Sequence, residues 1–182
     1  MSKLSIADGD LIKSLRAADV LQDVEEHLLD QKNGVILVTC SDADRFDDIF
    51  EHQKKMQLHQ RNDVRAHVLS WNGGALTCAP RSPVNIKKRA DKIFIEQIKS
   101  AREMKDIDLV VLLAHAPCGA AGKIKLTIEG SLWLQIAAKK EIKSLNEGIK
   151  VALFFHVDYD NGKKRTYFLS REKWDAWWHS HR

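Results

Sequence analysis

The sequence predicts an α/β fold, in which helices flank a mainly parallel β-sheet with an antiparallel edge strand. Continuous apolar and β-branched runs recur at residues 35–39, 109–114 and 149–156. Each run is too short for a buried helix and is typical of a strand covered on both faces. Segments with apolar residues at three- and four-residue spacing separate the runs, and such alternation predicts strand–helix–strand units with a parallel sheet.

The remaining elements follow from local patterns. Leucines at helical spacing predict an N-terminal helix through the first thirty or so residues, which Asn33-Gly34 ends. Asn161-Gly162 predicts a tight hairpin turn into an antiparallel strand. Two glycine and two proline residues between positions 72 and 85 predict a long loop, of the kind that is often functional. Further helices are expected at 44–58, 86–104, 129–145 and 171–178, and further strands at 66–71 and 165–169.

Composition sets the class of protein. The 182 residues, 44% hydrophobic and 30% charged, predict one domain at 1–182, with an N-terminal helical arm at 1–33, an α/β core at 34–169 and a C-terminal helix at 170–182. The net charge of +4 is mild and interspersed, so no nucleic-acid partner is expected. No apolar run is long enough for a membrane span. Three cysteines, with no apolar leader before them, exclude a disulfide framework and favour the cytoplasm.

Chemistry-bearing residues follow two of the apolar runs. Cys40 ends the first run, while His115 and Cys118 follow the later one. In open α/β sheets, ligands bind at the carboxyl ends of the strands, so these side chains are expected at one edge. Two thiolates and an imidazole are donors that bind Zn²⁺ tetrahedrally and leave a fourth position open, as in catalytic sites. The alternative is that these are simply buried structural residues.

Two segments resemble the motifs of β-class carbonic anhydrases. The segment 40–45 reads Cys-Ser-Asp-Ala-Asp-Arg, similar to the family's C-x-D-x-R, and 115–119 reads His-Ala-Pro-Cys-Gly, matching H-x-x-C-G. The strand and hairpin at 155–163 are also similar to the end of the family's core. The resemblance implies that Cys40, His115 and Cys118 hold zinc. It also implies that Asp42 pairs with an arginine or moves onto the metal.

The chain departs from the family pattern in two places. Asp44 stands where the family has arginine, and Arg45 comes one residue later, still within reach of Asp42 across one helical turn. The segment 71–75 reads Trp-Asn-Gly-Gly-Ala where the family usually has arginine-asparagine-alanine-glycine. Asp42 can therefore act in catalysis or merely cap a helix. The fourth zinc ligand is water, Asp42 or Cys78, and the last of these would close the site.

The resemblance implies a zinc enzyme that reversibly hydrates carbon dioxide to bicarbonate. Zinc-bound hydroxide would attack the carbon, with Asp42 and Arg45 orienting it. The expected partners are the small-molecule substrate, carbon dioxide or bicarbonate, and further copies of the chain in a homodimer or larger homo-oligomer. The alternatives are a non-catalytic zinc-binding protein on the same fold and a zinc hydrolase of another heterocumulene, such as carbon disulfide.

Two other groups of residues invite a functional interpretation but favour a structural one. His156 lies within an apolar run and is expected to be a hydrogen-bonded core histidine. Trp174, Trp177 and Trp178 lie at helical spacing, which favours packing of the last helix over stacking on nucleic acid.

Overall fold

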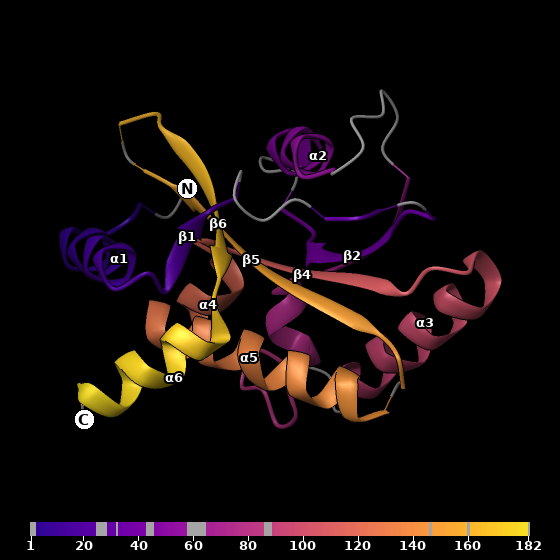
Figure 1. Cartoon of the computed structure of the whole chain (residues 1–182). Helices are drawn as coiled ribbons and strands as arrows, with labels where there is room; N and C mark the ends of the chain where they lie inside the picture. Colours follow the sequence, from indigo (N-terminus) through magenta and orange to yellow (C-terminus); the bar gives the residue numbers. More distant parts are fainter. Residues whose placement is uncertain are drawn as a thin grey trace.

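Six strands form one β-sheet: β1 (Leu21–Asp23), β2 (Val35–Cys40), β3 (Ala66–Trp71), β4 (Leu109–Ala116), β5 (Lys150–Asp158) and β6 (Lys164–Leu169). Their order across the sheet is β1-β6-β5-β4-β2-β3 (Figure 1). The computed structural model describes residues 3–24, 29–31, 33–42, 46–57, 65–85, 89–145, 147–159 and 161–181.

The sheet is mainly parallel, as predicted. β2 pairs in parallel with β3 and β4, and β4 pairs in parallel with β5. β6 runs antiparallel to β5 and also to β1. The predicted antiparallel strand is therefore present, but it is not at the edge, because β1 pairs with its outer side.

Helices cover both faces of the sheet: α1 (Ile6–Ala17), α2 (Phe46–Lys55), α3 (Ala90–Lys105), α4 (Gly119–Lys123), α5 (Ile128–Leu145) and α6 (Arg171–Ser180), with the 3₁₀ helix η3 (Gly74–Cys78). α2 packs on one face, and α1, α3, α5 and α6 pack on the other (Figure 1). This confirms the α/β class. None of the helices in the described ranges combines the length and the apolar character that crossing a bilayer requires.

Side chains alternate between two apolar cores along each central strand. On β5, Leu153 and Phe155 face the larger core beneath α1, α3, α5 and α6, and Phe154 faces the smaller core beneath α2. β2 and β4 are buried along their whole length. Strands covered on both faces need apolar residues on both, which explains the continuous apolar runs in the sequence.

The N-terminal segment differs from the predicted long helix. α1 ends at Ala17, and Asp19 adopts a left-handed backbone with φ of 56°. The chain then enters β1, where Leu21 pairs with Leu169 and the carbonyl of Val20 accepts a hydrogen bond from Ser170 at 3.0 Å. Pairing with a distant strand therefore overrides the helical spacing of the leucines.

The C-terminal elements agree with their sequence signals. Tyr159 and Lys163 close the β5–β6 hairpin with a backbone hydrogen bond of 2.8 Å, and Gly162 supplies the positive φ that the turn needs. Asp160, part of the expected turn, lies outside the described residues. Trp174 and Trp177 are buried, with ring centroids 5.6 Å apart, so α6 packs on its own domain's core.

Candidate metal centre

The ends of two neighbouring parallel strands carry the three predicted ligands. Cys40 is the last residue of β2, and His115 is the penultimate residue of β4. Cys118 stands just beyond β4, at the residue before the first turn of α4. β2 and β4 are hydrogen-bonded neighbours. Their carboxyl ends therefore meet at one edge of the sheet, where ligand sites of α/β folds form.

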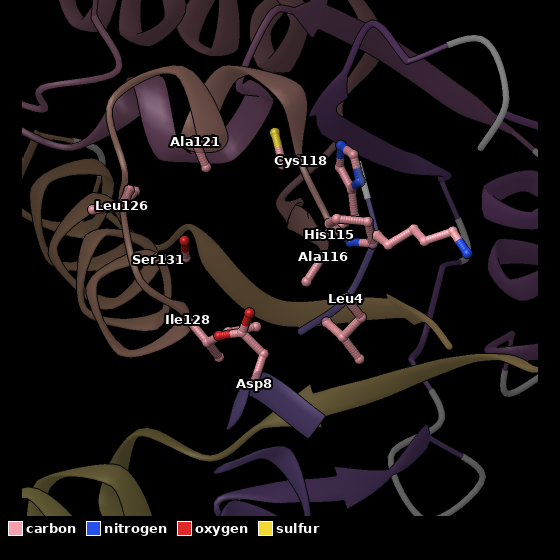
Figure 2. A pocket seen from close by; sticks show the side chains of 12 residues that line it. Leu4, Asp8, His115, Ala116, Cys118, Ala121, Leu126, Ile128 and Ser131 are labelled. Atoms are coloured by element: carbon pink, nitrogen blue, oxygen red, sulfur yellow. The ribbon is translucent and has the colours of Figure 1, made fainter. Parts of the chain in front are cut away.

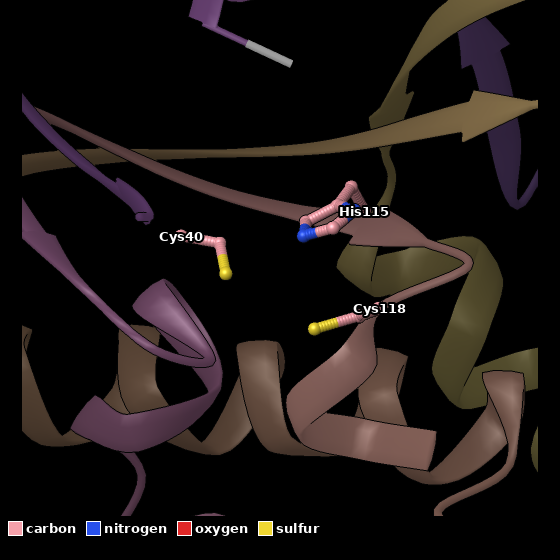
Figure 3. Close-up of side chains that lie close together, drawn as sticks. All are labelled: Cys40, His115 and Cys118. Carbon is pink, nitrogen blue, oxygen red and sulfur yellow. The ribbon is translucent and has the colours of Figure 1, made fainter. Parts of the chain in front are cut away.

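These three side chains converge on one point (Figure 3). The two Sγ atoms and a His115 ring nitrogen all lie within 4.8 Å of one another. All three residues are buried, with 3% to 7% of their surface exposed. Within the described ranges, no other trio of histidine, cysteine or acidic side chains comes together in this way.

His115 provides a test of whether a metal fits here. Neither of its ring nitrogens has a hydrogen-bond partner among the described residues, although both are buried. Buried polar groups in proteins are normally bonded, and leaving one unpaired costs about 1–3 kcal/mol. Coordination of a metal ion would satisfy one nitrogen. Two sulfurs and one imidazole form the donor set that suits Zn²⁺, so the residues fit this ion.

The two thiols of the cluster differ in acidity. The neighbouring Cys118 thiol, together with burial, raises the pKa of Cys40 well above its ordinary value. The neighbouring Cys40 thiol and His115 lower the pKa of Cys118. Two buried thiols side by side therefore resist ionising together, and the shifts favour the thiolate at Cys118.

A glycine pair in the predicted long loop supports Cys40. The backbone N–H of Gly73 donates a hydrogen bond to Cys40 Sγ at 3.3 Å. Gly74 has a φ of 48°, and a Cβ there would lie 2.3 Å from the backbone nitrogen of Cys40. Only glycine lets the chain pass so close to the ligand. The sequence indicated a functional loop here but gave no sign of this hydrogen bond.

The same loop contains more regular structure than predicted. Residues 74–78 form η3, which is buried throughout. Cys78 lies in this helix, and burial raises the pKa of its thiol. The group of three converging ligands does not include Cys78.

The structure places Asp42 beside the cluster. Its Oδ2 atom lies 3.9 Å from His115 Nε2, and its side chain is 29% exposed. That distance is too long for a hydrogen bond but within the range of an electrostatic contact. The predicted partner of Asp42, Arg45, lies outside the described residues, as do Ala43 and Asp44.

Two cavities border the cluster. The first, called here the apolar cavity, has a volume of about 160 Å³ and reaches His115 and Cys118. Leu4, Leu126 and Ile128 line it, as do Asp8 and Ser131 (Figure 2). Lys3 also lines it. The second, called here the polar cavity, has a volume of about 230 Å³ and reaches Cys40 and Asp42.

Comparisons with known proteins show similarity to solved structures of carbonic anhydrases. No family model matches the chain, and no curated protein matches it in sequence. A carbonic anhydrase from Streptococcus mutans is 20% identical, with 89% of this chain and 96% of that chain covered and a TM-score of 0.48. A β-carbonic anhydrase from Trichomonas vaginalis is 14% identical, with 93% and 100% covered and a TM-score of 0.46.

A tetrameric β-carbonic anhydrase from Sordaria macrospora is also similar, at 11% identity. Here 79% of this chain and 83% of that chain are covered, with a TM-score of 0.42. The case for function therefore rests on the residues of the metal centre.

Proposed function

We propose that the chain is a zinc-dependent carbonic anhydrase that reversibly hydrates carbon dioxide to bicarbonate. The observation that carries the proposal is the convergence of Cys40, His115 and Cys118 within 4.8 Å at the carboxyl edge of the sheet. The resemblance of the segments 40–45 and 115–119 to the two family motifs supports it.

Each residue of the centre has a part in this proposal. Cys40, His115 and Cys118 would hold the zinc ion and leave one coordination position for solvent or substrate. Zinc bound there would lower the pKa of a coordinated water to near neutrality. The carboxylate of Asp42, which lies beside His115 and lines the polar cavity, would accept a hydrogen bond from a donor bound there and so orient it.

We extend the proposal to the surroundings of the site. Arg45 pairs with Asp42 and keeps this carboxylate off the metal. The chain works in the cytoplasm as a single domain and assembles as a homodimer or larger homo-oligomer, as the family resemblance implies. Light scattering at micromolar protein concentration tests the assembly, and a monomeric mass would contradict it.

Metal analysis combined with stopped-flow hydration of carbon dioxide tests the function on one purified sample. We expect about one zinc ion per chain and hydration that a chelator removes. Cys118→Ser should lose both zinc and activity, because it removes one of three ligands. Cys78→Ala is the matched control, since it removes a buried thiol that is outside the trio, and it should keep both.

Other outcomes would favour the alternatives. Stoichiometric zinc without hydration at any pH would support a non-catalytic zinc-binding protein. Stoichiometric zinc with hydrolysis of carbon disulfide, but no hydration of carbon dioxide, would support a different heterocumulene as substrate. Full activity in Cys118→Ser would contradict the proposed centre altogether.

A further inference from the structure

Residues 3–8, called here the N-terminal strap, form one wall of the apolar cavity. The strap contributes three side chains to that wall: Lys3, Leu4 and Asp8. His115 and Cys118 of the metal centre line the same cavity. Figure 2 shows side chains of the strap and of the metal centre around one open space. The strap therefore stands between the solvent and this side of the metal centre.

Leu4 is the apolar side chain that holds the strap in place. It is half-buried and packs on the larger core. Ile6, two residues later, has 87% of its surface exposed. Ser5 begins α1, and its Oγ atom accepts a hydrogen bond from the backbone N–H of Asp8 at 3.0 Å. That bond is internal to the strap, so it shapes the strap but does not fasten it to the rest of the protein.

Gly9 separates the strap from the anchored part of α1. Ile12 and Leu15 are fully buried and fix the second half of the helix. Glycine is the least favourable helix residue after proline, and Asp8 and Asp10 on either side of it are also poor helix formers. Segments with few buried apolar contacts open more readily than the core. We therefore expect α1 to open first on the N-terminal side of Gly9.

We propose that the N-terminal strap is a gate of the metal centre, which opens at Gly9 and exposes Cys118 through the apolar cavity. The inference rests on the proposed function and adds a regulated entrance to the same site. The polar cavity is a separate approach, because it reaches Cys40 and is lined by other segments of the chain. The gate should therefore control access to the cluster at Cys118 and leave access at Cys40 unchanged.

Alkylation of the three cysteines in the metal-free full chain tests the gate. Iodoacetamide reacts with a thiolate only when it reaches it, and mass spectrometry of the peptides gives an initial rate for each cysteine. Leu4→Ser should speed alkylation of Cys118 by about fivefold, the size expected for loss of one half-buried apolar contact. Cys40 and Cys78 are internal controls whose rates should stay unchanged, because one lines the polar cavity and the other is buried in η3.

Two further variants separate opening of the gate from general loosening of the protein. Ile6→Ser is the matched control, because it changes an exposed side chain of the same strap, and it should alter the rate at Cys118 by less than about twofold. Gly9→Ala should act in the opposite direction. A Cβ at Gly9 would meet no atom within 4 Å, and alanine stabilises the helix, so Cys118 should react about fivefold more slowly.

Several results would overturn the inference. An unchanged rate at Cys118 in Leu4→Ser would do so, as would an equal rise at all three cysteines, which would show that the whole domain loosens. A rate in Gly9→Ala that is not slower would overturn the opening at Gly9.

The alkylation needs neither zinc nor turnover, so it separates the inference from the proposed function. A gated Cys118 in a chain that binds zinc but does not hydrate carbon dioxide would contradict the proposed function alone. Hydration by a chain whose Cys118 rate is indifferent to Leu4→Ser would contradict the inference alone.

Discussion

Two buried histidines occupy matching positions on neighbouring strands, and their surroundings differ. His115 on β4 and His156 on β5 are register partners, with 3% and 0% of their surfaces exposed. His156 Nδ1 lies 2.9 Å from Thr166 Oγ1, and its ring lies 5.6 Å from that of His52. His115 has two thiols beside it and no hydrogen-bond partner among the described residues.

This comparison shows what makes a buried histidine a candidate ligand. Both strands are apolar and both histidines are well covered, so burial alone does not distinguish them. The difference comes from what the neighbouring strands carry: β2 brings Cys40 to His115, while β6 brings Thr166 to His156. His156 is thus a buried, hydrogen-bonded residue of the core, as its place within an apolar run predicted.

The largest effect should come from replacing each histidine in turn. His115→Gln should weaken zinc binding by about a thousandfold, because three ligands share a binding free energy of about 10–16 kcal/mol. His156→Gln should change the dissociation constant for zinc by no more than about tenfold, because His156 is not a ligand and can act on the metal only through other residues. Competition with a chromophoric chelator measures both. Equal losses in the two variants would break the distinction between the histidines.

A smaller effect should come from replacing the glycine beside Cys40, in comparison with a glycine of the β5–β6 hairpin. Gly74→Ala should lower the free energy of unfolding by about 3 kcal/mol, because it combines a left-handed backbone with a clash. The new Cβ would lie 2.3 Å from the backbone at Cys40. Gly162, in the β5–β6 hairpin, has a φ of 76°, but a Cβ there would meet no atom within 4 Å. Gly162→Ala should therefore lower the free energy of unfolding by only about 1 kcal/mol.

Urea unfolding of the metal-free variants measures these losses without any contribution from bound zinc. Equal losses for the two glycine variants would show that the loop at residues 73–74 is not held against Cys40.

The effect of pH sharpens the account of the thiols. Because the pKa of Cys40 is raised, zinc must displace its proton, while the lowered pKa of Cys118 favours its thiolate before zinc binds. Zinc affinity should therefore rise with pH by about tenfold per unit between about pH 7 and 8, with one proton released. Two ordinary thiols would release two protons and give about a hundredfold per unit. Calorimetry in two buffers of different ionisation enthalpy counts the protons.

The sequence predicted most of the sheet because its strands are long apolar runs. The strand at residues 66–71 agrees with β3 at both ends, and the runs at 35–39 and 109–114 lie within β2 and β4. β1 could not be predicted. It has three residues, and it is a strand only because Leu21 pairs with Leu169, almost the full length of the chain away.

The candidate ligands were predictable because strand ends of a parallel sheet meet at one edge. That rule brought together Cys40, His115 and Cys118 from positions far apart in the chain. The hydrogen bond from Gly73 and the wall of the polar cavity at Lys123 depend on the backbone path of two connecting segments. No periodicity in the sequence records such a path, so these features required the structure.

X-ray absorption spectroscopy of the zinc-loaded chain tests the central claim most directly, because it reports the atoms bound to the metal. The account predicts two sulfur ligands at about 2.3 Å and two nitrogen or oxygen ligands at about 2.0–2.1 Å. A shell of nitrogen and oxygen alone, or one with three sulfurs, would contradict a centre built from Cys40, His115 and Cys118.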